Sequence, residues 1–496
     1  MQGFLDVPRW WIEIAFVLYA IVITAIVMLE RRRPSSTLAW ILALILLPVV
    51  GLVLYFLVSR RRVARRLRHR ERRWIRPIDA TRGLASMEIC PDDLPAPQRG
   101  LVHLALRTAA APLRRCERVQ LYASPAEAFA AMEEAIRAAT RAICLEFYIW
   151  RDDETGRRWI DLLCERARAG VDVRLLYDDF GSLGSGHLLR RLREAGGEVV
   201  AFAPLRLHLR LRRSRLNFRN HRKILTIDGA IGFTGGLNIG DEYLSSAPDG
   251  RRWDDLQVRV EGNAVLGLDA IFLEDWISAR GEAVGYDPAD PQIAQRLGLR
   301  ALYTAPQRRS TGPLVQIIPS GPDLPSTHTI AAQFTAAIAV AQRICWIATP
   351  YFVPDEPLML ALVTAAWRGV DVRILVPSPT NNDARLVSWA ARSYYDELLA
   401  AGCRIFEYQL GMLHAKCMTI DDHVAAVGSA NMDIRSFYLN YEVTAMFYDP
   451  IVSAQLAEIF SAHLPHSVEI RPVQRSRLSL PHRLGEAAAR LLSPLL

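Results

Sequence analysis

This chain contains two widely separated copies of one pattern of chemically active residues. Each copy has a histidine, a lysine and an aspartate at fixed spacing, followed by a turn of small residues that ends in an asparagine. The members of the first copy are His221, Lys223, Asp228, Gly235, Gly236 and Asn238, and those of the second are His414, Lys416, Asp421, Gly428, Ser429 and Asn431. In both copies the asparagine lies 17 residues after the histidine. Equal internal spacing at so many positions predicts two half-sites that form one composite site.

The residue types in this pattern suit a reaction at a phosphodiester. Such a substrate is an anion, so lysine cations and amide donors stabilise the charge on its transition-state oxygens. A neutral imidazole can attack phosphorus to give a covalent phosphohistidine, while a second imidazole protonates the leaving alcohol and deprotonates the incoming one. We expect Lys223, Lys416, Asn238 and Asn431 to bind the phosphate. Two histidines suffice for this chemistry, so we expect neither a metal nor another cofactor.

Each histidine needs an acceptor for its second ring nitrogen, because that hydrogen bond fixes the tautomer presented to the substrate. One candidate carboxylate follows each histidine along the chain. Asp255 follows His221 and Glu442 follows His414, and both acids lead into an apolar, strand-like run. The alternative is that both are ordinary charges at strand ends.

The remaining motif residues are expected to shape the backbone. Lysine pairing or turn structure explains Asp228 and Asp421 better than contact with phosphorus. Gly236 and Ser429 are expected at turns where the backbone approaches a neighbour closely.

These motifs resemble those of the phospholipase D superfamily, whose members carry two such HKD motifs in one chain, and in detail those of bacterial cardiolipin synthases. The resemblance covers nearly the whole chain. Its details are Arg215-x-Asn217-x-Arg219-Asn220-His221-Arg222-Lys223, Phe233-Thr234-Gly235-Gly236-x-Asn238, Tyr351-Phe352-x-Pro354, Leu413-His414-x-Lys416 and the C-terminal segment 490–496. It implies that one phosphatidylglycerol is attacked at phosphorus with release of glycerol, and that a second phosphatidylglycerol captures the phosphatidyl group to give cardiolipin.

We expect His221 to be the nucleophile and His414 the general acid and base, but the similarity of the two copies leaves the reverse assignment open. Water competes with the lipid alcohol, so an apolar cleft facing the membrane is expected. Four aromatic residues either line this cleft or belong to the core: Tyr148, Trp150, Tyr351 and Phe352. The same motifs would also serve a lipid hydrolase, a transphosphatidylase with another donor, or a membrane-tethered nuclease.

Composition supports an acidic, membrane-bound substrate. The chain has 496 residues, of which 51% are hydrophobic, and a formal net charge of +8. Its basic residues are concentrated, with ten arginines and one glutamate in residues 60–76 and eight basic residues without an acid in 206–223. Such runs suit anionic lipid headgroups, although nucleic acid and simple membrane anchoring are alternatives.

Two apolar stretches near the N-terminus predict a transmembrane helical hairpin. Residues 10–29 contain one charge, Glu13, and residues 38–58 contain none, so each approaches the ~20 residues that span a bilayer. A cleaved signal peptide is the alternative for the first stretch, but no small-residue cleavage site follows it. The loop holds three arginines and the segment after the second stretch holds ten, which predicts a catalytic body in the bacterial cytoplasm. The seven cysteines are scattered, as in a reducing compartment.

Beyond the basic stretch the chain predicts an internal repeat of helices and strands. The first copy should comprise a helix at 125–141, a strand within 142–150, a helix ending at Gly170, a strand at 171–177, a helix at 188–195 and a strand at 199–202. The second should comprise a helix at 329–342, a strand at 344–348, a helix ending at Gly369, a strand at 370–376 and a helix before a strand at 404–406. This alternation predicts two pseudo-symmetric α/β/α units with mostly parallel sheets, and the two HKD motifs would meet at their interface.

The expected order along the chain is a two-helix membrane hairpin (1–60), a basic juxtamembrane segment and linker (61–118), a first phospholipase D-like unit (119–280), a linker (281–313), a second unit (314–470) and a basic tail (471–496). The tail alternates arginines with leucines. It forms either an amphipathic helix on the bilayer or a terminal helix packed on the protein body. The number of copies in the assembly is left open.

Overall fold

The computed structural model describes residues 9–29, 34–48, 51, 55, 94–204, 218–244, 252–280, 311–322 and 328–493. It divides into one unit of Met1–Arg70 with Arg206–Asn217, and a second of Glu71–Leu205 with Phe218–Leu496. Several predicted features lie outside the described residues: the basic run 60–76, most of the run 206–223, the arginines of the 31–33 loop and nearly all of the linker 281–313.

The smaller unit contains two apolar helices, α1 (Arg9–Leu29) and α2 (Pro34–Leu46). They pack through the buried side chains of Val27 and Leu44, and the Tyr19 hydroxyl donates to the Leu44 carbonyl over 3.1 Å. The predicted second span, 38–58, lies only partly within the described residues. Among those residues, no helix has both the length and the hydropathy that crossing a bilayer requires.

The larger unit is built on two mixed β-sheets. Within the described residues the first sheet has seven strands in the order β2, β9, β7, β6, β3, β4, β5. Its strands are β2 (Arg118–Tyr122), β3 (Ala142–Phe147), β4 (Asp172–Asp178), β5 (Glu198–Phe202), β6 (Ile224–Ile227), β7 (Ile231–Gly235) and β9 (Gln257–Glu261).

The second sheet repeats this order. Over the residues that the structure describes it has nine strands, β1, β10, β19, β17, β16, β11, β13, β14, β20. Its strands are β1 (Arg114–Arg115), β10 (Leu314–Ser320), β11 (Ile344–Ala348), β13 (Asp371–Pro377), β14 (Arg404–Tyr408), β16 (Cys417–Ile420), β17 (Val424–Gly428), β19 (Glu442–Phe447) and β20 (Ser467–Ile470). The seven strands from β10 to β14 match the first sheet one for one, and β1 and β20 extend its two edges, so the predicted repeat is confirmed.

The prediction of mostly parallel sheets is wrong. Only the β3–β4 and β4–β5 pairs in the first described sheet, and β11–β13 and β13–β14 in the second, are parallel. Each HKD motif instead runs into an antiparallel hairpin, β6–β7 or β16–β17. The hairpins turn at Asp228 and Asp421, whose φ angles of 55° and 50° lie in the left-handed region that aspartate tolerates. The tight turn reverses the chain, so the strands on its two sides are antiparallel.

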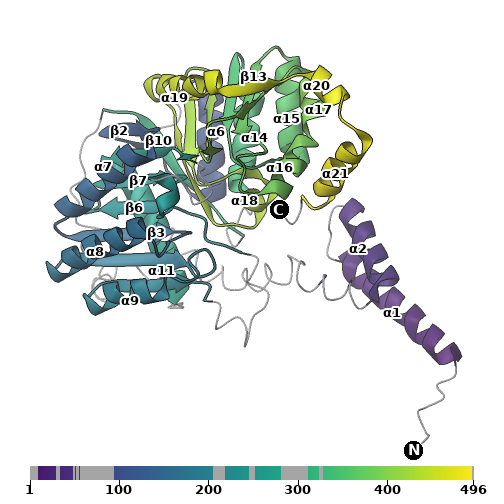
Figure 1. The fold of residues 1–496 in the computed structure, drawn as a ribbon, viewed down its shortest axis with the longest axis horizontal. Helices are drawn as coiled ribbons and strands as arrows, with labels where there is room; N and C mark the ends of the chain where they lie inside the picture. Colours follow the sequence, from purple (N-terminus) through teal and green to yellow (C-terminus); the bar gives the residue numbers. More distant parts are fainter. Residues whose placement is uncertain are drawn as a thin grey trace, which may run out of the picture. The chain divides into compact units, whose positions relative to one another are not determined.

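Helices cover the outer faces of the sheets at the predicted places. On the first sheet they are α7 (Pro125–Ala138), α8 (Glu154–Arg168) and α9 (Gly186–Glu194), and on the second α14 (Thr329–Val340), α15 (Glu356–Trp367), α16 (Arg385–Arg392) and α17 (Tyr395–Ala401). Glycines in the left-handed conformation follow α8 and α15, with φ of 88° at Gly170 and 87° at Gly369. Each repeat closes with a long helix, α11 (Val265–Arg280) or α19 (Pro450–His463). Figure 1 shows α7, α8 and α9 together on one sheet and α14, α15 and α17 on the other.

Helix α6 (Ala96–Ala109) belongs in space to the second half, although it precedes the first in sequence. Gln316 of β10 donates to the Val102 carbonyl over 3.2 Å, and Gln333 of α14 donates to the Leu101 carbonyl over 3.0 Å. Figure 1 shows this dark blue helix among green ones. Part of the segment expected to be a juxtamembrane linker therefore packs into the second core.

The C-terminal tail forms α20 (Pro472–Ser476) and α21 (Leu480–Leu491). Helix α21 packs against α16, and a Cβ at Gly485 would lie 2.3 Å from the Trp389 ring. Arg475, which is 5% exposed, pairs with Glu486 of α21 over 2.7 Å and with Asp396 of α17 over 2.8 Å. The structure thus shows the tail packed on the protein body.

Candidate active site

The two HKD segments meet because the backbone just before each histidine pairs with a short segment of the other repeat. Strand β15 (Met412–Leu413) runs parallel to β8 (Trp253–Asp254), and the His414 amide donates to the Asp254 carbonyl over 2.6 Å. In the same way, Asn220 forms a parallel bridge with Tyr441, whose carbonyl accepts from the His221 amide over 2.9 Å. These two crossings bring both histidines into one site, as the sequence predicted.

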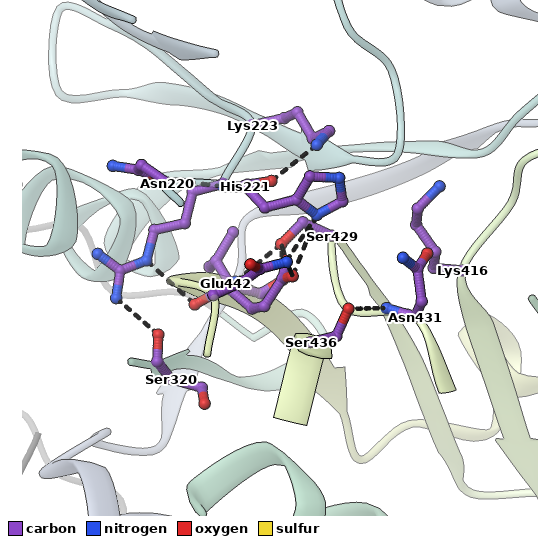
Figure 2. Close-up of polar contacts among 12 residues, drawn as sticks. Asn220, His221, Lys223, Ser320, Lys416, Ser429, Asn431, Ser436 and Glu442 are labelled. Atoms are coloured by element: carbon purple, nitrogen blue, oxygen red, sulfur yellow. Dashed lines mark hydrogen bonds and ion pairs between the residues drawn. The ribbon is translucent and has the colours of Figure 1, made fainter. Parts of the chain in front are cut away.

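Each histidine is held by a carboxylate from the opposite repeat. His221 Nδ1 lies 3.1 Å and 3.0 Å from the two carboxylate oxygens of Glu442, and His414 Nδ1 lies 2.6 Å from Asp255 Oδ2. Figure 2 shows the His221 ring directed at Glu442. Both candidate acids lie beside the histidines, but each contacts the histidine of the opposite repeat and not the one that it follows in the chain. The reason is the parallel pairing of short segments between the two repeats. It places the residue that follows each paired segment beside the histidine of the other repeat.

The two lysines are buried and lie next to the histidines. Lys223 Nζ donates to the His221 carbonyl over 2.7 Å, and Lys416 Nζ donates to the His414 carbonyl. Burial lowers the pKa of Lys223 to about 7 and that of Lys416 to about 8, although nearby carboxylates oppose this. Buried cations with spare donors favour an anionic ligand, which would compensate them.

Both imidazoles are neutral in the free site at neutral pH. Burial lowers the pKa of His221 to about 4, despite the opposing effect of Glu442, and Lys223 adds to the lowering. Burial and the two lysines hold the pKa of His414 well below its ordinary value. A neutral ring whose Nδ1 donates to a carboxylate presents an unprotonated Nε2, the form that can attack phosphorus.

The two carboxylates differ in their proton affinity. Burial would raise the pKa of Glu442, but the His221 and Lys223 interactions and the Ser429 hydroxyl outweigh it, so this pKa is lowered. Burial prevails at Asp255 and raises its pKa to about 6, although Lys416 opposes this. The two halves are therefore similar in geometry and unequal in electrostatics.

Gly236 and Ser429 occupy matching positions, which were expected at close turns, and a steric reason explains why the residue types differ. A Cβ at Gly236 would lie 2.0 Å from Asp255 Oδ1, so only glycine fits there. Ser429 occupies the corresponding place in the second half, where its hydroxyl donates to Glu442 Oε2. Asn431 lies beside Lys416 in Figure 2, and its backbone N–H donates to Ser436 Oγ over 3.2 Å. Asn238 bridges Ile149 N–H and the Tyr243 hydroxyl.

Asp228 and Asp421 serve the turns and not the reacting groups. Asp228 accepts from the amides of Thr140, Arg141 and Ala142 at 2.7–2.9 Å. Asp421 accepts in the same way from the amides of residues 342–344 at the start of β11. Of the two explanations considered, these contacts support turn structure, because both carboxylates accept hydrogen bonds from backbone amides.

Sequence comparison identifies the family. The family described as cardiolipin synthase, phospholipase D-like domain, matches residues 132–276 and 334–464, and a phospholipase D-nuclease N-terminal family matches residues 15–60. A cardiolipin synthase of Halalkalibacterium halodurans is 38% identical over 98% of this chain and 95% of its own length. A cardiolipin synthase of Geobacillus thermodenitrificans is 38% identical over 96% of this chain and 91% of its own. The chain belongs to the cardiolipin synthase family. It is an enzyme of phospholipid transfer, as the sequence predicted.

A solved structure also resembles this member of the cardiolipin synthase family. A phosphatidylserine synthase of Haemophilus influenzae superposes on 80% of this chain and 100% of its own with a TM-score of 0.61, at 16% sequence identity. This likeness supports the α/β fold with two phospholipase D-like segments. Among the described residues, no group of three or more histidine, cysteine or acidic side chains is placed to hold a metal ion.

Sequence reasoning missed Arg222, which lies between the histidine and lysine of the first motif and is 2% exposed. Its Nε donates to the Glu442 carbonyl over 3.0 Å, its Nη2 donates to the Ser320 carbonyl over 3.1 Å, and its Nη1 pairs with Asp275. The matching position in the second motif is Ala415. This difference between the two copies was the available signal.

The aromatic residues divide between site and core. The Tyr148 ring packs edge-on against His221, with 5.1 Å between ring centroids. Trp150 and Phe352 are 1% and 0% exposed and belong to the core, the second of the two alternatives for these aromatic residues. Trp253, which the sequence did not single out, lies 4.9 Å from the His414 ring.

Proposed function

We propose that this protein joins two phosphatidylglycerol molecules to give cardiolipin and glycerol. The Nε2 of His221 attacks the phosphorus of the first lipid, and the bond from phosphorus to the oxygen of the headgroup glycerol breaks. The His414–Asp255 pair supplies the proton to this oxygen, since bound phosphate raises the proton affinity of nearby groups. The headgroup hydroxyl of the second lipid then gives its proton to His414, its oxygen bonds to phosphorus, and His221 leaves.

The crossed pairs of histidine and carboxylate carry this proposal. Two oriented neutral imidazoles lie with two buried lysines in one site, which supplies a nucleophile, an acid and base, and cations for one phosphate. We assign phosphate binding to Lys223, Lys416, Asn238 and Asn431. The family supports phosphatidylglycerol as the lipid on both sides of the reaction.

We also propose that residues 1–60 form a two-span membrane hairpin in the bacterial cytoplasmic membrane, with the catalytic unit on the cytoplasmic side. The two apolar stretches in the sequence, 10–29 and 38–58, and the matching N-terminal family support this. The boundaries expected for the two phospholipase D-like units, 119–280 and 314–470, are part of the same proposal. Because the headgroups lie at the bilayer surface, this arrangement would hold the site near its substrate.

The test is lipid mass spectrometry on the purified full chain with phosphatidylglycerol in mixed micelles. We expect cardiolipin and an equal amount of free glycerol, and loss of both in His221→Ala and in His414→Ala. Asp422→Asn, at an exposed acid that pairs with Arg343, is the matched control and should retain activity. Phosphatidic acid as the only product would make the protein a hydrolase and would refute the proposal.

A further inference from the structure

An acidic side chain lies at a site that is otherwise arranged for an anion. Asp383 is exposed, in the loop that follows the carboxyl end of β13. Its charge acts on both His414 and Lys416 and raises their pKa values, although burial dominates and lowers both. A carboxylate repels a phosphate, so an acid whose charge reaches His414 and Lys416 suits another ligand chemistry.

The structure holds Asp383 firmly against Tyr351. The Tyr351 hydroxyl donates to the two carboxylate oxygens at 2.8 Å and 3.0 Å. Asn382 Nδ2 donates to the Pro350 carbonyl over 3.2 Å, and Asn382 Oδ1 accepts from the Ala384 amide over 2.8 Å, so the residues on both sides are anchored. A carboxylate accepts about four hydrogen bonds, and the tyrosine supplies one proton, so acceptor capacity remains.

Tyr351 is connected to the phosphate-binding side of the site. Its carbonyl accepts from the Thr349 hydroxyl over 3.1 Å. The Thr349 hydroxyl oxygen in turn accepts from the amide of Met432, which follows Asn431 in the chain. Strand β12 (Phe352–Val353) pairs with β18 (Met432–Asp433) directly after this contact. Burial and the Asp383 charge raise the pKa of Tyr351, so its hydroxyl keeps its proton and remains a donor.

The first half has no such exposed acid at the matching place. Asp178, the last residue of β4, is 1% exposed and accepts from the backbone amides of Phe180, Gly181 and Asn220 at 3.0–3.1 Å. Asp178 therefore fixes the loop, whereas Asp383 remains available.

A fixed carboxylate beside an acid and base histidine suits a neutral ligand that donates hydrogen bonds. Given the proposed function, the group that leaves or enters beside His414 is a glycerol unit, whose free hydroxyls are such donors. We propose that Asp383, positioned by Tyr351, accepts hydrogen bonds from the hydroxyls of the glycerol headgroup and thereby selects a polyol over other alcohols. This assigns a headgroup subsite to the second half of the molecule.

The test is a competition between two soluble alcohols in one reaction. The full chain is given phosphatidylglycerol in mixed micelles with isotope-labelled glycerol and ethanol, and the ratio of labelled phosphatidylglycerol to phosphatidylethanol is measured. A ratio from one vessel is independent of how much of a variant is folded. We expect Asp383→Asn to lower the ratio roughly tenfold or more, since a hydrogen bond to a charged group is weakened. Tyr351→Phe should lower it less.

Asp422→Asn is the matched control, because this exposed acid pairs with Arg343 and lies outside the subsite. An unchanged ratio in Asp383→Asn would overturn the proposal. In a parallel reaction, ethanolamine replaces glycerol as the competitor of ethanol. If Asp383→Asn lowers the use of ethanolamine more than the use of glycerol, the carboxylate recognises an ammonium group and the proposal is overturned. Cardiolipin formation by the unaltered protein is scored separately. A protein that makes phosphatidylethanol but no cardiolipin refutes the proposed function and leaves the ratio interpretable.

Discussion

Buried lysines give the site its expected dependence on pH. Burial lowers the pKa of Lys223 to about 7 and that of Lys416 to about 8, so the free site loses these charges as the pH rises. A bound phosphodiester favours the protonated lysines and raises their pKa values. Affinity should therefore be highest below pH 7 and fall above it, by up to about tenfold per pH unit for each lysine that must regain a proton.

The measurement is the inhibition constant of glycerophosphoglycerol between pH 6 and pH 9, because the charge of this diester is constant over that range. In Lys416→Arg the guanidinium stays protonated, and the fall should be shallower. An inhibition constant that does not change with pH would show that neither lysine titrates in the free site.

At the scale of elements, the parallel crossings decide which carboxylate serves which histidine. Glu442 begins β19 of the second repeat and holds His221 of the first, and Asp255 holds His414. In a His414→Ala background, Asp255 has lost its imidazole while the His221 pair is intact. With a phosphatidyl-nitrophenol, whose leaving group needs no proton, we expect Glu442→Gln to slow nitrophenol release about 10–100-fold further and Asp255→Asn to have little effect.

The experiment is a stopped-flow record of nitrophenol release by the two double variants. Pairing within each repeat requires the opposite order, with Asp255→Asn the slower of the two. Equal slowing would mean that both acids act through the fold and not through separate histidines.

At the scale of the whole molecule, neither repeat contains a complete site, because each supplies one histidine and the acid for the other. Elements beyond the repeats also contribute to stability. Arg475 and Glu486 form an ion pair whose side chains are 5% and 3% exposed, and this pair fixes α21 to the second half. Removing Glu486 leaves the buried Arg475 paired with Asp396, whose side chain is exposed and compensates the charge less well.

We therefore expect Glu486→Ala to lower the free energy of unfolding by about 3 kcal/mol. Leu484→Ala on the same helix is the control, because this side chain is 61% exposed and its loss should change stability by less than about 0.5 kcal/mol. Urea unfolding followed by tryptophan fluorescence measures both. Equal stability of the two variants would show that α21 contributes little to the fold.

The sequence by itself determined the composite site, the repeat and the family. Residue types and spacing specify chemistry locally, so His221, Lys223, His414 and Lys416 were recognisable without a fold. Hydrophobic periodicity likewise placed α14 and β11 to within a few residues, because helices and strands depend on nearby residues.

Only the tertiary structure decided that each histidine contacts the carboxylate of the other repeat. It also decided the hydrogen bonds of Arg222 to Glu442 and of Tyr351 to Asp383. The antiparallel hairpins in sheets that were expected to be mostly parallel have the same explanation. Strand direction and cross-repeat pairing depend on contacts between residues far apart in the chain, which no local pattern records.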